Sequence, residues 1–380
     1  MGLTSKVNER VVPISNPNLG CDPEMFLGKG GKIVESAEFV PVEGIKDPAQ
    51  YSSKPAIVRD GVQVELNPAA STCRAGVVNQ VAKLITQLSK DARSKGGDIS
   101  FAPVVELSKE EMERLSDAAR QLGCAPSLNL HDASASVVVG KDFRTRSAGG
   151  HIHIGMRIPV GMHERLVALM DVLLGNTQVM IDRDPSAAER RKTYGRAGEF
   201  RIPPHGLEYR TLSNWWLISS QMMSFVMGMT RLATHIFQQA QTPSSKPTKG
   251  ADWDGFGTSL NGWDPMKALL TRMDLPKVAR AINTNDLQLA KENWAIVRDF
   301  IDQHVPTMEA GLDTMKLDNF DYFLSEIESK GLKRWFPLDP VDHWSTVSEG
   351  HGVGWENWIE QCVDQVRAES KVSEMLARYR

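Results

Sequence analysis

Residues 147–157, Ser-Ala-Gly-Gly-His-Ile-His-Ile-Gly-Met-Arg, constrain the fold of this 380-residue chain more than any other stretch. Successive side chains of a β-strand point to opposite faces, so His151 and His153 share one face while Ile152 and Ile154 point the other way. The glycines on either side favour a place where backbone or ligand must come close. An isolated His-x-His pair is more often two hydrogen-bonded core histidines than a site.

Three further stretches repeat this alternation, and for that reason we interpret the two histidines as part of a site. They are residues 20–27, 60–68 and 206–212. The polar residues that share a face are Asp22 with Glu24, Gln63 with Glu65 and Asn67, and Glu208 with Arg210. A solvated edge strand would explain any one of these stretches alone. Four such strands together predict one sheet whose polar face is a cleft.

The composition is that of an ordinary globular chain, with 41% hydrophobic and 24% charged residues. The net charge of −3 argues against a nucleic-acid-binding surface. The cysteines form no Cys-x-x-Cys pair and no dense framework, which predicts reduced thiols in a cytoplasm. They are Cys21, Cys73, Cys124 and Cys362. We expect no signal peptide, because residues 1–10 lack an apolar core, and no membrane span, because polar residues interrupt residues 215–232.

Helical and strand patterns alternate along the first part of the chain, which predicts an α/β or α+β domain. Apolar residues at helical spacing predict helices over residues 75–93 and 161–184, and Ser108 begins a helix that ends near residue 123. A strand is expected over residues 99–105, between the helix over residues 75–93 and the helix that begins at Ser108. Beyond residue 214 the expected helices cover residues 215–241, 266–281, 286–304, 307–330 and 355–380. Residues 242–262 form a connector that is either a lid or only a linker.

The order of the polar motifs resembles the glutamine synthetase and glutamate-cysteine ligase superfamily, and within it the phage-encoded carboxylate-amine ligases of the second type. The motifs are Asp-x-Glu at 22–24, Glu-x-Asn-Pro at 65–68, Gly-Gly-His-x-His at 149–153, Arg-x(4)-Arg-Ile-Pro at 196–203 and Glu-x-Arg at 208–210. Each motif alone is weak, whereas their order and spacing are fairly specific. The resemblance covers residues 20–214.

This resemblance implies an α+β fold, with a curved, mainly antiparallel sheet, helices on one of its faces and a helical C-terminal extension. We therefore divide the chain into a catalytic core, residues 1–242, and an extension packed on it, residues 243–380. The implied location is the cytoplasm, which is the host cytoplasm for a phage-encoded protein. Synthetases of this kind form large rings and other members form dimers, so a homo-oligomer is compatible with the sequence.

The implied activity is ATP-dependent formation of an amide bond between a carboxylate and an amine. Ligases of this kind transfer the γ-phosphoryl group of ATP to the carboxylate, and the amine then attacks the acyl phosphate. Phosphoryl transfer needs reactants held in line and neutralised charge, which Mg²⁺ or Mn²⁺ on oxygen ligands provides. The carboxylate belongs to a small molecule or a peptide, and neither a membrane nor a nucleic acid is expected as a partner.

The resemblance also assigns roles residue by residue. Asp22 and Glu65 would hold one metal ion, and Glu24, His151 and Glu208 would hold the ion nearest the transferred phosphate. His153 would contact nucleotide or substrate. Arg196, Arg201 and Arg210 would contact ATP, with Arg210 facing the γ-phosphate or the substrate carboxylate, and Arg210, Glu208 and Glu24 would form the catalytic group. The first motif of the family usually carries two glutamates, whereas this chain has Asp22 in place of the first one. Asp60 lies where relatives place a further carboxylate.

Two other functions fit parts of the sequence. A metal-dependent amidohydrolase also begins its site with His-x-His, but such sites need more histidines, and the remaining ones form no second pair in the sequence. A non-catalytic module that keeps the fold is the other alternative. Intact acids at every matched ligand position argue against it.

Overall fold

The described residues form two five-stranded sheets and one two-stranded sheet, and every pairing between their strands is antiparallel. The computed structural model describes residues 17–40, 56–72, 74–120, 127–132, 143–182, 184, 186–241, 264–308 and 339–351. The first sheet has the order β1 (Asn18–Cys21), β10 (Ile152–Gly155), β12 (Gly206–Tyr209), β11 (Glu199–Arg201) and β8 (Leu128–Asn129). The second contains β3 (Lys32–Val34), β2 (Glu24–Lys29), β5 (Gln63–Asn67) and β4 (Ala56–Asp60), with β6 (Gly97–Ser100) also paired to β2. The two-stranded sheet joins β7 (Val104–Glu106) and β9 (Thr145–Ser147).

The two larger sheets meet at Asp22 and Pro23, which connect β1 to β2. Proline has no backbone N–H to donate to a ladder, so a continuous strand is interrupted there. The backbone nevertheless stays engaged, because the Pro23 carbonyl accepts from Leu66 N at 3.0 Å and Glu24 N donates to the Gly149 carbonyl at 2.8 Å. The expectation that all four polar-faced strands lie side by side in one sheet is therefore corrected. They lie in two sheets that share one continuous segment of chain.

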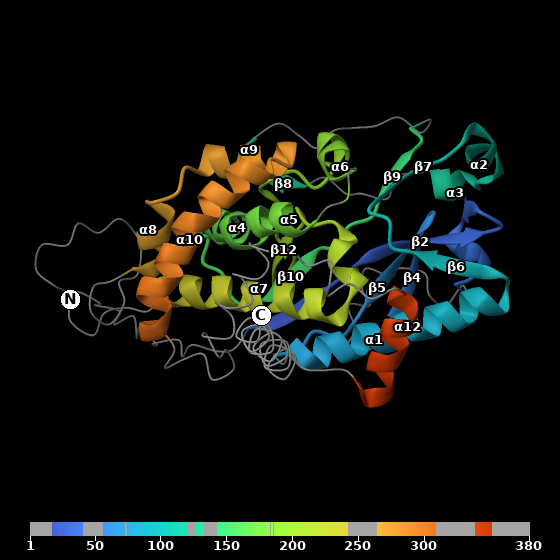
Figure 1. Ribbon diagram of the computed structural model, residues 1–380, viewed down its shortest axis with the longest axis horizontal. Coiled ribbons are helices and arrows are strands. Elements are labelled where there is room, and N and C mark those ends of the chain that lie inside the picture. The colour runs from blue at the N-terminus through green and yellow to red at the C-terminus, as the bar shows by residue number, and fades with distance from the viewer. Residues whose placement is uncertain are drawn as a thin grey trace, which may run out of the picture.

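Helices cover the apolar faces of these sheets, which confirms the expected α+β class. Helix α1 (Arg74–Ser94) contacts β4, β5 and β6, whereas α4 (His163–Met170) contacts β12. Helix α7 (Ser220–Gln241) packs on both α1 and α4. Figure 1 shows α1 and α7 along one side of the strands.

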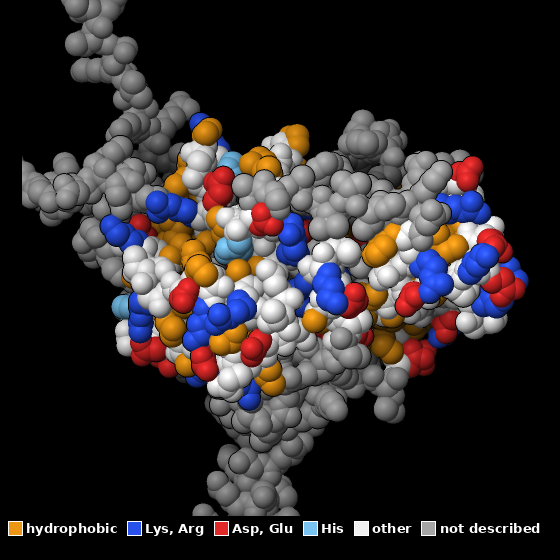
Figure 2. All heavy atoms as spheres, turned by 90° about the horizontal axis from the view of Figure 1, so that it is seen from above, with side chains coloured by type: hydrophobic (Ala, Val, Ile, Leu, Met, Phe, Trp, Pro, Cys, Tyr) orange, Lys and Arg blue, Asp and Glu red, His pale blue; other side chains and the backbone are white. Residues whose placement is uncertain are grey.

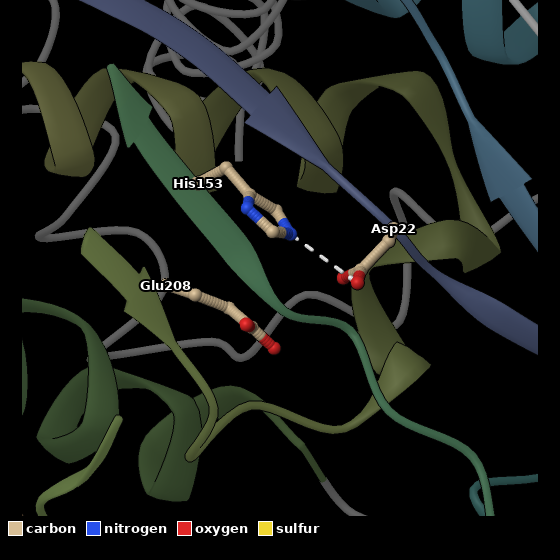
Figure 3. Close-up of side chains that lie close together, drawn as sticks. All are labelled: Asp22, His153 and Glu208. Atoms are coloured by element: carbon tan, nitrogen blue, oxygen red, sulfur yellow. Dashed lines mark ion pairs between the residues drawn. The ribbon is translucent and has the colours of Figure 1, made fainter. Parts of the chain in front are cut away.

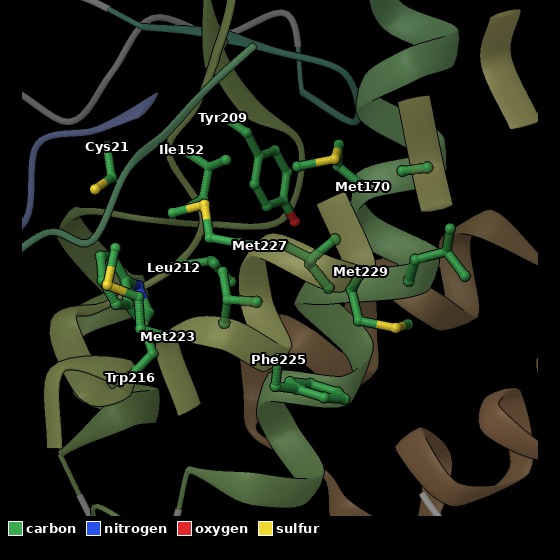
Figure 4. Close-up of a cluster of buried hydrophobic side chains, with 14 of the residues drawn as sticks. Cys21, Ile152, Met170, Tyr209, Leu212, Trp216, Met223, Phe225, Met227 and Met229 are labelled. Atoms are coloured by element: carbon green, nitrogen blue, oxygen red, sulfur yellow. The ribbon is translucent and has the colours of Figure 1, made fainter. Parts of the chain in front are cut away.

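A large hydrophobic core joins the strands to the helices. In Figure 4, Ile152 and Tyr209 from the strands lie near Met170 and the α7 methionine Met227, and Met223 of α7 belongs to the same cluster. All five of these side chains are buried. Methionine adapts to irregular gaps, and its frequency in α7 is accounted for by this packing between a sheet and two helices.

The expected helix over residues 161–184 is present, with an irregularity in its middle. It consists of α4, a π-helical turn η4 (Asp171–Gly175) and α5 (Asn176–Ile181). The helix expected from residue 215 is divided, because Ser219 is extended between the 3-10 helix η5 (Asn214–Ile218) and α7. Ser108 caps its helix as predicted, by a reciprocal capping box with Glu111. This helix, α2 (Lys109–Arg114), ends earlier than expected, at an extended Leu115.

The described helices beyond residue 263 share the same core. They are α8 (Pro265–Leu270), α9 (Leu275–Thr284), α10 (Leu287–Met308), α12 (Pro340–Thr346) and the π-helical turn η8 (Val347–His351). Their side chains Met266, Trp294 and Trp344 are buried in the cluster that contains Leu19 of β1. Helices α8, α9 and α10 lie toward one end of the long axis in Figure 1, and α12 lies against α1.

Several expectations lie outside the described residues, namely the connector at 242–262, the helix over 307–330 apart from its first two residues, and the terminal helix over 355–380. The remaining short helices of the described chain are η1 (Ser36–Glu38), α3 (Asp117–Arg120) and α6 (Ala187–Thr193). No helix in the described ranges is both long and apolar enough to span a membrane. Figure 2 shows acidic and basic side chains interspersed over the face that it presents.

Candidate active site

Among the residues that the structure describes, two groups of side chains could hold a cation, and Asp22, His153 and Glu208 form the first of them. His153 on β10 lies directly opposite Glu208 on β12, and Asp22 follows the last residue of β1. Their ligand-capable atoms all lie within 4.8 Å of one another. Figure 3 shows the three side chains converging from three different segments, with His153 Nε2 3.2 Å from Asp22 Oδ2.

Glu24, Asp60 and Glu65 form the second group, again with ligand-capable oxygens within 4.8 Å of one another. Glu24 on β2 and Glu65 on β5 are paired across the ladder. Two donors hold the Glu24 carboxylate, since its Oε2 accepts from Gly149 N at 2.7 Å and from Gln63 Nε2 at 3.0 Å. This all-carboxylate group adjoins the first one along the chain, at residues 22–24.

The glycines of the histidine motif allow this close assembly. A Cβ atom on Gly149 would lie 2.4 Å from His151 Nε2, and one on Gly150 would lie 2.2 Å from the Ser213 carbonyl oxygen. Real side chains do not approach so closely, so either substitution would displace the imidazole or the backbone. The glycines therefore allow the imidazole of His151 and the backbone of Ser213 to come close, as the presence of glycines in a strand motif predicts.

Three arginines were expected to contact phosphate, and the structure places them differently. Arg201 on β11 is opposite Glu208, with Nη1 3.5 Å from Oε1, and Arg210 forms a buried ion pair with the same carboxylate. Arg196 is instead engaged with Asp132 at 3.2 Å and Glu199 at 3.3 Å. Arg201 and Arg210 thus adjoin the first group of ligands, while Arg196 is held by two acids of its own.

The second group brings three carboxyl groups close together, and Glu24 and Glu65 among them are buried. Burial raises the pKa of Glu24 to about 8, and the neighbouring carboxylates of Asp60 and Glu65 act in the same direction. A divalent cation would offset this repulsion and favour the ionised form. Three carboxylates around one point are therefore a donor set that fits Mg²⁺.

The first group is balanced by cationic neighbours. Burial opposes ionisation of Glu208, but Arg210, His151 and His153 together hold the pKa of Glu208 below its usual value. Burial likewise opposes ionisation of Asp22, yet His151 and His153 hold the pKa of Asp22 well below its ordinary value. The pKa of His153 is raised, because Asp22 and Glu208 overcome the effect of burial.

The atoms that face one another in the first group fit a cation. Asp22 Oδ1 and His153 Nε2 are buried, and neither makes an aligned hydrogen bond to any residue in the described part of the chain. Two carboxylates and one imidazole form a mixed oxygen and nitrogen set that accepts Mn²⁺ as well as Mg²⁺. Both groups therefore suit the divalent ions that the resemblance implies.

The division of residues between the ions differs from the one that the resemblance implies. Asp22 lies with Glu208 rather than with Glu65, and Glu24 lies with Glu65 rather than with Glu208. His153 and Asp60 take part in the groups, whereas His151 contacts Asp22 from the side, with Nδ1 3.1 Å from Oδ1. The roles of the individual ligands remain predictions.

Two residues at the site were not singled out from the sequence. The Tyr194 hydroxyl lies 2.5 Å from His151 Nε2, and His205 Nε2 lies 3.0 Å from His153 Nδ1. Tyr194 falls within a run of basic residues and His205 is an isolated histidine after Pro204, so neither carries a local pattern. Only the chain path from α6 into β11 and β12 brings them to the histidine motif.

Comparison with known proteins gives one family. The model of the family described as "Phage phiEco32-like COOH.NH2 ligase-type 2" matches residues 91–252, which confirms the resemblance to carboxylate-amine ligases of the second type. Comparison with curated proteins gave no match.

Comparison with solved structures gave matches at low sequence identity. A "novel glutamine synthase homolog" is 13% identical, with 74% of this chain and 67% of that chain covered and a TM-score of 0.31. A structure described as "Apo GmaS without ligand" is also 13% identical, with 78% and 72% covered and a TM-score of 0.31. A "GmaS/ADP complex" is 13% identical, with 78% and 73% covered and a TM-score of 0.29.

Proposed function

We propose that this chain, whose residues 91–252 match the carboxylate-amine ligases of the second type, forms an amide bond in a reaction driven by ATP. The observation that carries the proposal is the pair of adjoining, largely buried groups, Asp22 with His153 and Glu208, and Glu24 with Asp60 and Glu65. Two cation sites side by side, with arginines next to one of them, are what phosphoryl transfer to a carboxylate requires.

In the proposed reaction, acidic residues would bind the cations and arginines would bind the phosphate groups. The carboxylates Asp22, Glu24, Glu65 and Glu208, with the imidazole of His153, would hold Mg²⁺ or Mn²⁺. Bound divalent cations supply neutralisation of phosphate charge and alignment of the reacting oxygens. Arg201 and Arg210 would bind phosphate oxygens, for which a planar guanidinium is suited because it donates two parallel hydrogen bonds.

The arginines near Glu208 would act on the transferred group. Arg210 is buried and ion-paired with Glu208, so its guanidinium is preorganised and loses little freedom when a phosphoryl oxygen arrives. In the proposed reaction the substrate carboxylate oxygen attacks the γ-phosphorus and ADP leaves. The amine nitrogen then attacks the acyl carbon, and inorganic phosphate leaves with formation of the amide. We place this reaction in the cytoplasm, where ATP and Mg²⁺ are available.

Hydroxylamine trapping tests the proposal without knowledge of the natural amine. The full chain is incubated with ATP, Mg²⁺, hydroxylamine and a panel of amino acids, peptides and other carboxylates, and hydroxamate and ADP are measured together. We expect one class of carboxylate to give hydroxamate and ADP in equal amounts, and EDTA to abolish both. Absence of ADP formation with every carboxylate, although Mg²⁺ and ATP bind, would contradict a ligase and support the non-catalytic alternative.

The same assay separates the hydrolase alternative. A metal-dependent amidohydrolase would cleave amides without ATP and would form no hydroxamate from a free carboxylate and ATP. Glu208→Gln is the matched variant for the ligase, because it keeps the size of the side chain but removes the charge that would face the ion. Hydroxamate formation at the rate of the unmodified chain in that variant would count against the site described above.

A further inference from the structure

Gln63 on β5 joins the second cation group to the segment that leads into the histidine motif. Its amide nitrogen lies 3.0 Å from Glu24 Oε2 and 2.8 Å from the Ser147 carbonyl oxygen. The short turn between β4 and β5 sets Gln63 directly opposite Asp60, which belongs to the same group. One side chain thus contacts both a carboxylate of the group and the backbone just before Gly149.

The partners of this amide determine which way it points. A backbone carbonyl only accepts hydrogen bonds, so the nitrogen of Gln63, and not its oxygen, faces Ser147. An amide nitrogen carries two hydrogens, and the second one is directed at Glu24 Oε2. Exchanging the oxygen and nitrogen of the amide would set two acceptors against each other at Ser147. The orientation of the Gln63 amide is therefore fixed by the groups around it.

The two oxygens of the buried Glu24 carboxylate differ in their surroundings. Oε2 accepts from the Gln63 amide and also from Gly149 N at 2.7 Å. A carboxylate has about four lone-pair directions over its two oxygens, so two donors occupy those of Oε2. Oε1 is the oxygen that these donors leave for a cation. The Gln63 and Gly149 donors together therefore favour a Glu24 that binds an ion through one oxygen only.

We infer that Gln63 is a positioning residue that holds Glu24 as a one-oxygen ligand and thereby favours Mg²⁺ over Ca²⁺ at the second group. The inference rests on the proposed function, which places a cation between Glu24, Asp60 and Glu65. Ca²⁺ takes about six to eight oxygen ligands and can bind a carboxylate through both oxygens. Mg²⁺ requires a regular octahedron of about six ligands and keeps several waters. A carboxylate with one oxygen engaged by two donors suits Mg²⁺ better than Ca²⁺.

Calorimetry of the full chain with MgCl₂ and with CaCl₂ tests this selectivity in the unmodified chain and in Gln63→Met. Methionine keeps the length of the side chain and removes both donors. The binding step of the second group is identified by its loss in Glu65→Gln. We expect the ratio of Mg²⁺ affinity to Ca²⁺ affinity to fall by about tenfold in Gln63→Met, the lower end of the effect of partners that orient metal ligands. An unchanged ratio, whether both affinities fall together or neither falls, would overturn the inference.

Infrared difference spectra test how Glu24 binds the ion in the unmodified chain, so this result does not depend on a folded variant of Gln63. The antisymmetric and symmetric stretching bands of a carboxylate lie closer together when both oxygens bind one ion than when one oxygen binds it. The bands of Glu24 are those that are missing in Glu24→Gln. With Mg²⁺ we expect the wide separation of a one-oxygen ligand, and the narrow separation would overturn the inference.

Gln80→Met is the matched control, because Gln80 is half-buried like Gln63 and forms hydrogen bonds of 2.7 and 3.2 Å to the backbone of Ala69, just beyond β5. In this control the affinity ratio and the Glu24 bands should match those of the unmodified chain. An equal change of the ratio in both variants would reduce Gln63 to a general structural role and overturn the inference. Failure of the unmodified chain to bind Mg²⁺ would overturn this inference together with the cation sites of the proposed function. An unchanged ratio in Gln63→Met with normal hydroxamate formation would overturn this inference alone.

Discussion

Buried carboxylates are the residues on which this site depends, and they are costly to bury. An ionised carboxylate away from water is tolerated only when it is paired, hydrogen-bonded or bound to a cation. Glu208 has Arg210 as its partner, whereas Glu24 has two hydrogen-bond donors and three acidic neighbours. The two glutamates should therefore respond differently to substitution.

For Glu24 we expect a pH-dependent effect on the metal-free protein. Its pKa is raised from 4.5 to about 8, so the folded state binds the proton more tightly than the unfolded state. The resulting contribution to the free energy of unfolding is complete below pH 4.5 and is lost as the pH rises through about 8. The loss amounts to about 1.4 kcal/mol for each pH unit between those two values.

The variant Glu24→Gln cannot ionise and keeps a carbonyl oxygen for Gly149 and Gln63. Thermal melts in EDTA should show this variant gaining stability relative to the unmodified chain between pH 5 and pH 9. With Mg²⁺ the order should reverse at pH 8, because a carboxylate binds the ion more strongly than a neutral amide does. Parallel pH profiles for the two proteins in EDTA would contradict the burial of a protonated Glu24.

Glu208→Gln separates chemistry from structure at the other glutamate. Breaking a buried ion pair costs about 3 to 5 kcal/mol, so some loss of melting temperature is expected from the cation left on Arg210. If Glu208 also binds the ion next to the transferred phosphate, turnover per folded molecule should fall further, by tenfold for about each 1.4 kcal/mol of lost positioning. The melt and the ATP-turnover assay are made on the same sample. A lower melting temperature with normal turnover per folded molecule would reject the ligand role.

At the scale of elements, β11 and β12 carry the cationic side of the site. Their pairing places Arg201 opposite Glu208, and Arg210 N donates to the Glu199 carbonyl directly after β12. Arg196 precedes β11 and forms an ion pair with Asp132, which follows the edge strand β8. The run of basic residues around 189–201 is thus not one uniform solvated loop, because its members face different parts of the molecule.

We expect Arg201→Ala to weaken binding of an ATP analogue with Mg²⁺ by at least tenfold in calorimetry. A charge-assisted contact to phosphate contributes about 1.5 to 3 kcal/mol, which corresponds to that factor or more. Arg196→Ala is the comparison, and its effect should be smaller, since Arg196 must first leave its two acids. Unchanged affinity in Arg201→Ala would show that Arg201 is a solvated residue that does not bind phosphate. A larger loss of affinity in Arg196→Ala than in Arg201→Ala would contradict the inference that Arg201 is the more important of the two for ATP binding.

At the scale of the whole molecule, helices from the end of the described chain complete a core begun by the first strand. Trp344 of α12 is fully buried and donates through Nε1 to the Leu217 carbonyl at 2.6 Å. Thr86 of α1 and His343 of α12 add contacts to this seam, the latter by accepting from Ser220 N at 2.9 Å. We therefore propose that residues 243–380 are an extension that folds together with the core rather than apart from it.

Trp344→Ala tests this cooperation. Loss of a buried tryptophan costs about 3 to 5 kcal/mol, and in a single cooperative unit that cost should lower the denaturant midpoint of every probe equally. Urea unfolding is followed by circular dichroism and by Mg²⁺ binding at the site. Two separate transitions, with only the helical one shifted by the substitution, would show that the extension folds independently.

The sequence alone determined which side chains act together within each segment. Alternation along a strand is local geometry, so the prediction that His151 and His153 share a face follows from their spacing, and both contact Asp22 in the structure. The α+β class and the principal helices follow from periodicity for the same reason. The turn of the β2–β3 hairpin at Lys29–Lys32 is local in the same sense, because the two glycines between these lysines adopt positive φ.

Only the tertiary structure decided how the segments meet. Contacts between residues far apart in the chain decided three features of the site. They are the break between the sheets at Pro23, the register that sets His153 opposite Glu208, and the position of Asp60 beside Glu24 and Glu65. Tyr194 reaches His151 for the same reason, across 43 positions in the sequence. Strand register and helix packing are selected by the burial of a shared core. The free energy of this burial is spread over many residues, so no single motif reveals the register or the packing.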